Sequence, residues 1–281
     1  MTLGNYEIIL QKAGFHSIRD KSSGEIMHSV TEPMTESREL YVKQLNPQRE
    51  LSHSIGSDLV IWDVGLGAAT NAMATILECE KLRATSGASR PLHIVSFEND
   101  LDSFRLAIRN PSLFPYVQHA APAALLENFY WESNDHLCRW TLHEGDFRTH
   151  IEHAPPPDCI YYDMYSLAAN EWLWSAELFS RIFDRCISKR TRLITYSVST
   201  QIRSALLAAG FFVGYGAGTG PKTETTIAFN SLDAVDPQIT LLGQEWLSKW
   251  ERSTAKTSKS ANESERLEIE HKVRAHRQFA L

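Results

Sequence analysis

The sequence predicts a Rossmann-like α/β fold in which a mainly parallel sheet of seven strands has helices on both faces. From residue 58 onward, short apolar runs alternate with longer segments of helical spacing. The runs are apolar on both faces, which is typical of strands buried in a parallel sheet. The last two runs follow each other without a helix between them, so the last strand of the sheet should be antiparallel.

The expected strands and helices alternate along the chain. The strands lie at residues 59–64, 92–98, 138–144, 158–164, 191–197, 210–216 and 223–229. Helical segments are expected near residues 69–83, 100–109, 121–132, 170–188 and 199–209. The final two strands should form a hairpin, because only a loop rich in glycine and proline separates them.

The regions that flank this pattern have a different character. We expect an N-terminal segment at 1–57, which contains short β-like pieces and then a helical stretch, and a core domain at 58–235. A charged, helical extension is expected at 236–281, with an amphipathic helix at 244–250 and a second helix at 266–277.

Composition limits the classes of protein that this chain can be. Hydrophobic residues make up 43% and charged residues 22%, as in ordinary globular proteins. No apolar run approaches the roughly 18 residues of a membrane span, and the N-terminus lacks the pattern of a secretory signal. The four cysteines are far apart, so we expect reduced, buried thiols, no structural zinc and a cytoplasmic protein. The net charge of −6 means that a nucleic-acid partner would need a local basic patch.

A glycine turn and a carboxylate indicate a nucleotide-type cofactor. Gly65 and Gly67 follow the first core strand, and Glu98 ends the second. Such a turn can serve packing alone. An acid at the end of the next strand, however, lies at the position where a ribose diol would bind. Asn71 and Ala72 stand where a dinucleotide fingerprint has its third glycine. This departure favours S-adenosylmethionine over a nicotinamide cofactor.

Two further acids lie at strand ends. Asp146 follows the third strand, where a carboxylate can accept a hydrogen bond from an adenine amino group; the alternative is an ordinary turn aspartate. Asp163 ends the fourth strand, at the edge where such sheets bind ligands. It could orient an amine nucleophile or take its proton, and the alternative is a helix N-cap.

Other clusters carry weaker signals. His150 and His153 lie in a loop rich in proline without a third ligand at a fixed spacing, so we expect no metal. Trp172 and Trp174 could stack on a base or pack in the core. No nucleophile elbow occurs.

Together these pieces resemble the MnmC-type tRNA methyltransferase domain, a family that makes 5-methylaminomethyl(-2-thio)uridine at the tRNA wobble position. The resemblance covers roughly residues 20–230 and implies the class I methyltransferase fold. Its motifs stand here as GEIMHSVTEPMTESRELYV (24–42), DVGLGAATN (63–71), SFE (96–98), DMYSLAANEWLW (163–174), TYS (195–197), RSALLAAGF (203–211) and GTGPKTE (218–224).

The resemblance implies methyl transfer from S-adenosylmethionine to the aminomethyl nitrogen of a modified uridine. The implied cofactor-binding residues are Asp63, Gly65, Gly67, Asn71, Glu98 and Asp146. The implied catalytic residues are Asp163, which would hold the amine, and Tyr165. The implied substrate-binding residues are Tyr41, Ser166, Trp174 and Lys222. tRNA is the implied partner, and separate oxidase or aminomethyl-forming enzymes would act upstream, because the family's fused oxidase domain is not in this sequence.

The sequence departs from the family pattern in two places. Ala69 replaces the last glycine of the turn, and Asp63 replaces a glutamate. Met164, Leu167 and Glu171 replace residues around the substrate pocket, which leaves the acceptor open. The alternatives are a methyltransferase of a small-molecule amine, a non-catalytic paralogue, and an aminopropyltransferase. The candidate tRNA-binding cations are Lys222, Arg203, Arg38 and Lys43, and in the tail Lys256, Lys259, Arg266, Lys272, Arg274 and Arg277. For the tail, a charged and solvated helix is the favoured interpretation.

Overall fold

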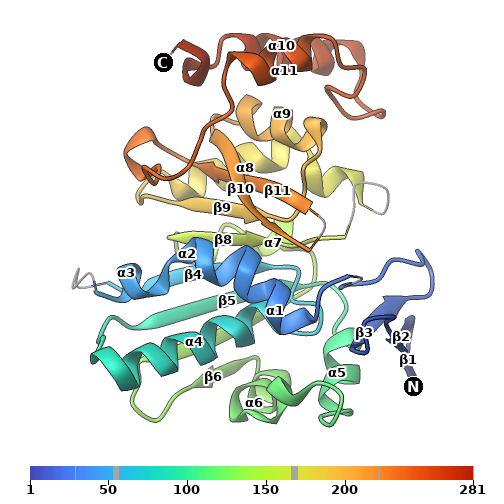
Figure 1. Ribbon diagram of the computed structural model, residues 1–281, viewed down its shortest axis with the longest axis vertical. Coiled ribbons are helices and arrows are strands. Elements are labelled where there is room, and N and C mark those ends of the chain that lie inside the picture. Colours follow the sequence, from blue (N-terminus) through green and yellow to red (C-terminus); the bar gives the residue numbers. More distant parts are fainter. Residues whose placement is uncertain (29, 53–56, 166–169, 221, 281) are drawn as a thin grey trace.

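The computed structural model describes residues 1–28, 30–52, 57–165, 170–220 and 222–280. An eight-stranded sheet runs the length of the molecule, in the order β10-β11-β9-β8-β4-β5-β7-β6 (Figure 1). Seven of these strands are those expected from the sequence: β4 (Leu59–Val64), β5 (Leu92–Glu98), β7 (Cys138–Glu144), β8 (Cys159–Tyr162), β9 (Arg192–Thr195), β10 (Phe212–Thr219) and β11 (Lys222–Phe229).

The topology confirms the predicted fold class. Strands β7, β5, β4, β8 and β9 are parallel to one another, whereas β11 is antiparallel to both β9 and β10. The last strand is inserted between β9 and β10. Because β5 and β8 lie on opposite sides of β4, the chain order reverses at β4, and the carboxyl ends of these three strands form the usual ligand-binding crevice.

Several element limits are shifted by a few residues, and two of the expected helices are divided in the structure. The helix expected at 121–132 is α6 (Ala120–Asn128), and Phe129, with φ 57°, ends it in a left-handed conformation. The chain then forms the short edge strand β6 (Tyr130–Glu132), antiparallel to β7. The helix expected at 170–188 is a 3₁₀ turn, η3 (Glu171–Trp174), followed by α8 (Ala176–Cys186). Ser175 caps α8 by accepting a hydrogen bond from the Leu178 N–H.

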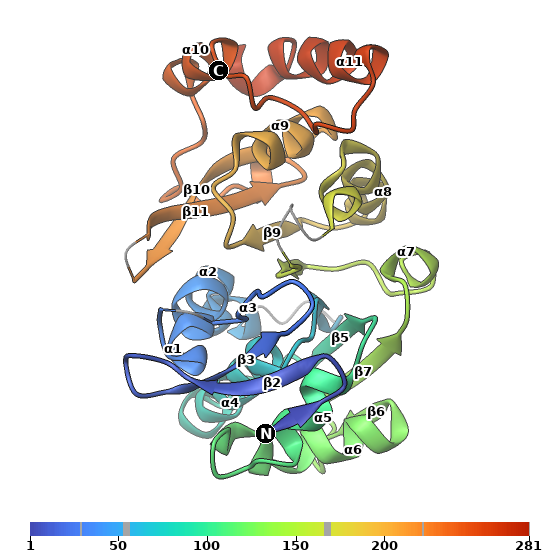
Figure 2. The ribbon, with the colours of Figure 1, turned by 90° about the vertical axis from the view of Figure 1, so that its right-hand side faces the viewer.

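Each face of the sheet has its own core. Along β4, Leu59 and Ile61 point to one face, while Val60, Trp62 and Val64 point to the other. The first face is covered by α4 (Thr70–Ser86), α5 (Asp102–Ile108), η2 (Pro115–Gln118) and α6. The second face is covered by α7 (Phe147–His150), α8 and α9 (Thr200–Ala208), and Figure 2 shows the two layers on either side of the sheet.

The N-terminal segment packs into the first core. It begins with an antiparallel sheet of β1 (Thr2–Leu3), β2 (Tyr6–Leu10) and β3 (His16–Asp20). It continues through α1 (Pro33–Ser37), η1 (Arg38–Val42), α2 (Lys43–Leu45) and α3 (Pro47–Ser52). Tyr6, Ile18 and Tyr41 are buried in the same cluster as the side chains of α4 and α5. The segment therefore shares a core with the sheet.

The C-terminal extension packs on α9 and on the sheet edge. It contains η4 (Leu232–Ala234), α10 (Gln244–Glu251), α11 (Glu263–Arg274) and η5 (Arg277–Ala280). The Trp250 Nε1–H donates to Ser204 Oγ of α9 at 2.7 Å. The Gln278 side chain accepts from the N–H of Val213 and donates to its carbonyl, so it satisfies the edge strand β10. Among the described residues, no helix combines the length and apolarity that a membrane span requires. The domain limits at 57 and 235 stay predictions.

Candidate active site

A cavity of about 410 Å³ lies at the carboxyl ends of β4, β5 and β8, within the usual size range of ligand pockets. The N-terminal segment forms its opposite wall. Seven of the predicted site residues line it, although they are far apart in the sequence: Tyr41, Gly65, Gly67, Asn71, Glu98, Asp163 and Tyr165. The fold thus brings the expected cofactor residues and the expected catalytic residues into one space.

The glycine turn lies against the backbone of Asp163. Gly65 has φ 93°, and a Cβ placed on it would lie 2.6 Å from the Asp163 carbonyl oxygen. Real Cβ atoms do not come that close, so glycine allows both the turn and the close approach of the two loops. Gly67 has φ 53° and donates its N–H to Glu98 Oε2 at 3.0 Å. The turn therefore joins the predicted cofactor and acceptor sides of the cavity.

Replacing Gly65 by Ala should destabilise the protein more than the same change at Gly14. Gly14 has φ 87° but no atom within 4 Å of a built Cβ, so it isolates the cost of the left-handed conformation. That cost is about 1–2 kcal/mol. At Gly65 the clash with Asp163 should add about 1–3 kcal/mol. Urea unfolding of both variants measures the difference. Equal losses of unfolding free energy would contradict the close approach.

Ala69 occupies the left-handed region at the start of α4, with φ 66°. This is the position where the resembling family has its last glycine. An alanine with positive φ carries a strain of about 1–2 kcal/mol, which glycine would not. The turn is held in spite of this strain, because the Tyr116 hydroxyl donates to the Ala68 carbonyl and the Ala69 N–H donates to the Leu66 carbonyl.

Glu98 is held by three backbone donors. Its Oε2 accepts from the Gly67 N–H, and its Oε1 accepts from the N–H groups of Asn99 and Asp100. Burial raises the pKa of Glu98, and these hydrogen bonds oppose that shift by stabilising the carboxylate. The side chain consequently connects the glycine turn to the end of β5 and faces the cavity.

Asp63 lies beneath the turn and does not line the cavity. Its Oδ2 accepts from Ser96 Oγ at 2.7 Å, and its buried Oδ1 has no partner. Burial raises the pKa of Asp63 to about 7; the hydrogen bond from Ser96 opposes the shift, and the charges of Asp163 and Glu98 add to it. Direct cofactor binding by Asp63 stays a prediction.

Asp163 is fixed by a chain of hydrogen bonds from two helices. Asn71 Nδ2 of α4 donates to Asp163 Oδ2 at 2.7 Å, and Ser37 Oγ of α1 donates to Asn71 Oδ1 at 2.6 Å. The second bond fixes the orientation of the amide, so its NH₂ group must face the carboxylate. Burial raises the pKa of Asp163, and the nearby charge of His28 lowers it. Asn71, predicted to contact the cofactor, therefore orients the candidate catalytic acid in this structure.

Tyrosine side chains line the same cavity as this carboxylate. The buried Tyr41 hydroxyl lies beside Asp163, the buried Tyr165 hydroxyl lies beside Tyr6, and the Tyr196 hydroxyl donates to the Met164 carbonyl at 3.1 Å. Burial raises the pKa of Tyr41 and Tyr165, so both hydroxyls stay protonated at neutral pH.

The sequence analysis missed several residues of this wall. His28, Glu36 and Met27 of the N-terminal segment line the cavity, as does Tyr196 after β9. The quoted motifs in 24–42 and 195–197 contain all four, so they were the available signal. No spacing rule showed that these motifs would face Asp163.

Four more predicted residues lie away from the cavity or outside the described residues. Asp146 caps α7 and binds Arg148, whose hydrogen bonds lower the pKa of the Asp146 carboxyl. Trp174 is 1% exposed and donates its Nε1–H to the Tyr165 carbonyl at 3.0 Å, so it supports the segment that follows β8. Ser166 and the side chain of Lys222 lie outside the described residues. The adenine contact of Asp146 and the substrate contacts of Trp174, Ser166 and Lys222 stay predictions.

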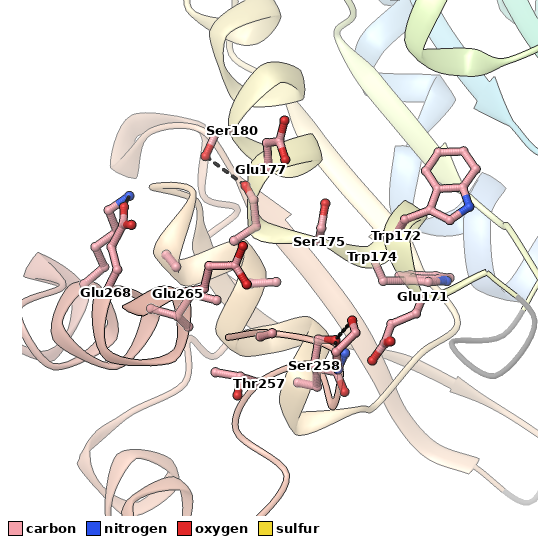
Figure 3. Close-up of a pocket in the computed structure, with 18 of the residues that line it drawn as sticks. Glu171, Trp172, Trp174, Ser175, Glu177, Ser180, Thr257, Ser258, Glu265 and Glu268 are labelled. Carbon is pink, nitrogen blue, oxygen red and sulfur yellow. Dashed lines mark hydrogen bonds and ion pairs between the residues drawn. The ribbon is translucent and has the colours of Figure 1, made fainter. Parts of the chain in front are cut away.

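A larger cavity of about 920 Å³ separates α8 from the C-terminal extension (Figure 3). Glu171 lies on one side of it and Glu265 and Glu268 of α11 on the other. The Lys259 N–H donates to Glu171 at 3.1 Å, which ties the extension to the start of η3. Its lining contains none of the predicted site residues except Trp174. Size alone therefore does not identify the site of chemistry.

His150 and His153 do not form part of a metal-binding cluster. Among the residues that the structure describes, no group of three or more His, Cys, Asp or Glu side chains could hold a metal ion. The His150 ring contacts the Glu144 carbonyl and stacks on His143, with ring centroids 5.0 Å apart.

Comparison with known proteins identifies the class of the chain. Residues 112–231 match the family described as S-adenosyl-L-methionine-dependent methyltransferase. The bifunctional MnmC protein of tRNA 5-methylaminomethyl-2-thiouridine biosynthesis from Aeromonas hydrophila is 26% identical over 72% of this chain. Its counterpart in Paracidovorax citrulli is 30% identical over 58% of this chain. The matches cover 32% and 26% of those relatives, so the chain spans about a third of their length or less.

Solved structures confirm the fold. The MnmC2 crystal structure from Aquifex aeolicus superimposes with a TM-score of 0.69 at 23% identity, covering 98% of this chain and 85% of that one. A probable spermidine synthase from Corynebacterium glutamicum gives a TM-score of 0.50 at 13% identity, covering 92% and 94%. These likenesses establish the Rossmann-like α/β fold.

Proposed function

We propose that this chain, an S-adenosyl-L-methionine-dependent methyltransferase, methylates the aminomethyl nitrogen of 5-aminomethyl(-2-thio)uridine at the tRNA wobble position. The proposal rests chiefly on one observation: Asp163, whose carboxylate is fixed by Asn71 and whose backbone packs against the glycine turn, lines an acidic cavity. The relatives also support the proposal, because they are named as proteins of tRNA 5-methylaminomethyl-2-thiouridine biosynthesis.

The charge of the cavity favours cationic ligands. Four carboxylates line it, and no lysine or arginine is found among its described lining residues. The four are Glu25, Glu36, Glu98 and Asp163. A primary alkylamine is an ammonium at neutral pH, and a sulfonium is also cationic, so both reactants would be attracted to the same space.

The residues present fit the cofactor. The backbone of the Gly65–Gly67 turn and the Glu98 carboxylate, which line the cavity together, would hold S-adenosylmethionine. When bound, the cofactor supplies an electrophilic methyl group. Asp163 would hold the amine beside it, and Tyr41 and Tyr165 would shape the pocket and exclude water. This arrangement acts mainly through alignment of the reacting atoms.

Most of the cations expected to meet tRNA are already paired. Arg203 is 4% exposed and donates to Glu224, Thr226 and the Thr225 carbonyl, so its expected role as an RNA contact was wrong. In the C-terminal extension, Arg274 binds Glu251 and Glu270, and Lys272 binds Glu268. Lys222, at the start of β11, stays the proposed contact with the RNA backbone.

Titration of tRNA at several salt concentrations tests the RNA part of the proposal. Binding should weaken as salt rises, and Lys222→Ala should flatten the log–log slope by about one unit, because one phosphate contact is lost. Lys272→Ala is the matched control and should leave the slope unchanged. Wild-type binding without salt dependence, or no binding, would contradict the tRNA assignment.

The second candidate function is methylation of a small-molecule amine. The acidic cavity and the net charge of −6 favour it, since neither requires a nucleic acid. Methyl incorporation into bulk tRNA, compared with incorporation into a panel of free alkylamines, separates the two candidates. We place the reaction in the cytoplasm, downstream of separate enzymes that build the aminomethyl group.

A further inference from the structure

A histidine–glutamate pair faces Asp163 across the cavity. His28 Nδ1 lies 2.8 Å from Glu36 Oε2, and both side chains line the cavity and are largely buried. The His28 charge is close enough to lower the pKa of Asp163. Nothing in the predicted cofactor or substrate sites uses this pair.

Two contacts hold the pair in place. The His28 N–H donates to Ser17 Oγ of β3 at 3.2 Å, which ties the segment to the N-terminal sheet. Glu36 belongs to α1, whose first turn is capped by Glu32 through the N–H groups of Met34 and Thr35. The next residue, Ser37, begins the hydrogen-bond chain to Asp163. The pair and the acid are therefore positioned by the same helix.

The hydrogen bond determines which ring nitrogen is basic. A carboxylate at Nδ1 selects the tautomer in which Nδ1 carries the proton and donates it to Glu36. Nε2 then has the free electron pair and is the atom that can accept a proton. A carboxylate behind a histidine also stabilises the imidazolium that forms.

We propose that His28, oriented by Glu36, is the general base that removes the proton from the substrate ammonium while Asp163 holds the amine. The inference rests on the proposed function. One N–H bond of the ammonium breaks and a new N–H bond forms at His28 Nε2. The bonding electron pair stays on the amine nitrogen, which becomes the neutral nucleophile. His28 afterwards releases the proton to solvent, so no other co-reactant is needed.

The groups that surround His28 leave it suited to this task. A carboxylate that pairs with the ammonium is occupied by that contact and is not the base that removes the proton. The tyrosines hold their own protons at neutral pH. The titratable groups that face the same cavity are Glu25, Glu36, Glu98, Asp163, Tyr6, Tyr41, Tyr165 and Tyr196. Among its described lining residues, His28 is the one imidazole.

The pH dependence of single-turnover methylation tests the role of His28. The probe is tRNA carrying 5-aminomethyl-2-thiouridine, with saturating S-adenosylmethionine. The wild-type rate should fall as the solution is made more acidic, because a protonated base cannot accept the proton of the ammonium. In His28→Asn the rate at neutral pH should fall at least about 100-fold. It should recover at higher pH, where the amine loses its proton to water. Glu36→Gln should give a smaller loss.

Controls separate this role from a structural one. His136→Asn removes an exposed histidine that also contacts a glutamate, 3.2 Å away, and should change neither rate nor profile. S-adenosylhomocysteine affinity should be unchanged in His28→Asn, and His28→Gln replaces it if that variant does not fold. A wild-type pH profile retained in the His28 variants would overturn the inference but leave the function standing. A wild-type protein that methylates no tRNA would instead overturn the proposed function.

Discussion

Replacing Asp163 by Asn should reduce turnover at least about 100-fold while cofactor affinity stays within about twofold of wild type. The substitution preserves shape but removes the charge that holds the amine. The new amide would turn its oxygen toward the Asn71 Nδ2 donor, because that donor is fixed by Ser37. Its NH₂ group would then replace the second carboxylate oxygen and present a donor where the amine needs an acceptor.

Two assays check this expectation. Single-turnover methylation measures the chemical step, and calorimetry with S-adenosylhomocysteine measures the cofactor site. Asp184→Asn, on α8 beside the second cavity, is the matched control and should leave both unchanged. An Asp163→Asn variant that binds the cofactor and turns over at a near wild-type rate would show that Asp163 is not a catalytic residue.

Glu98→Ala should weaken S-adenosylhomocysteine binding at least tenfold, which corresponds to about 1.4 kcal/mol. The change removes the proposed ribose acceptor, and it also releases the N–H groups of Gly67, Asn99 and Asp100. Charge-assisted hydrogen bonds contribute about 1.5–3 kcal/mol each before compensation, so a tenfold loss is a lower limit.

The neighbouring strand offers a control for Glu98. Glu144 ends β7 and is paired in register with Glu98, but it is exposed and does not line the cavity. Glu144→Ala should bind S-adenosylhomocysteine like wild type in the same calorimetric titration. Unchanged affinity in Glu98→Ala would refute the assignment of the cofactor site, whatever the result for Asp163.

The sheet could be predicted because its strands are buried on both faces. Residues such as Ile61, Val95 and Ile160 have no solvent-facing side, and their apolar runs stand out from the amphipathic helices between them. The exposed edge strand β6 has only three residues, too few for a periodic signal, and it was absorbed into the preceding helix. The turn at Phe129 that separates the two has no glycine to mark it.

The cofactor side of the site was predictable for a related reason. Gly65, Gly67, Glu98 and Asp163 stand at strand ends, and the topology of a parallel sheet places those ends together. The opposite wall comes from a segment without such a rule. His28 and Glu36 meet Asp163 only through packing of α1 against α4, a tertiary contact that no spacing encodes. For Arg203 the sequence prediction failed. Its charge suggested an RNA contact, but the buried side chain instead donates hydrogen bonds to Thr226 and Glu224 of β11.

The most direct test of the central claim is the fate of an isotopically labelled methyl group. Wild-type protein is incubated with methyl-labelled S-adenosylmethionine and tRNA that carries 5-aminomethyl-2-thiouridine, and the digested nucleosides are analysed by mass spectrometry. We predict that the label appears in 5-methylaminomethyl-2-thiouridine, on the exocyclic nitrogen, and is lost with Asp163→Asn. Label on a base carbon or in a different nucleoside, or unlabelled tRNA from protein that binds S-adenosylhomocysteine, would contradict the account.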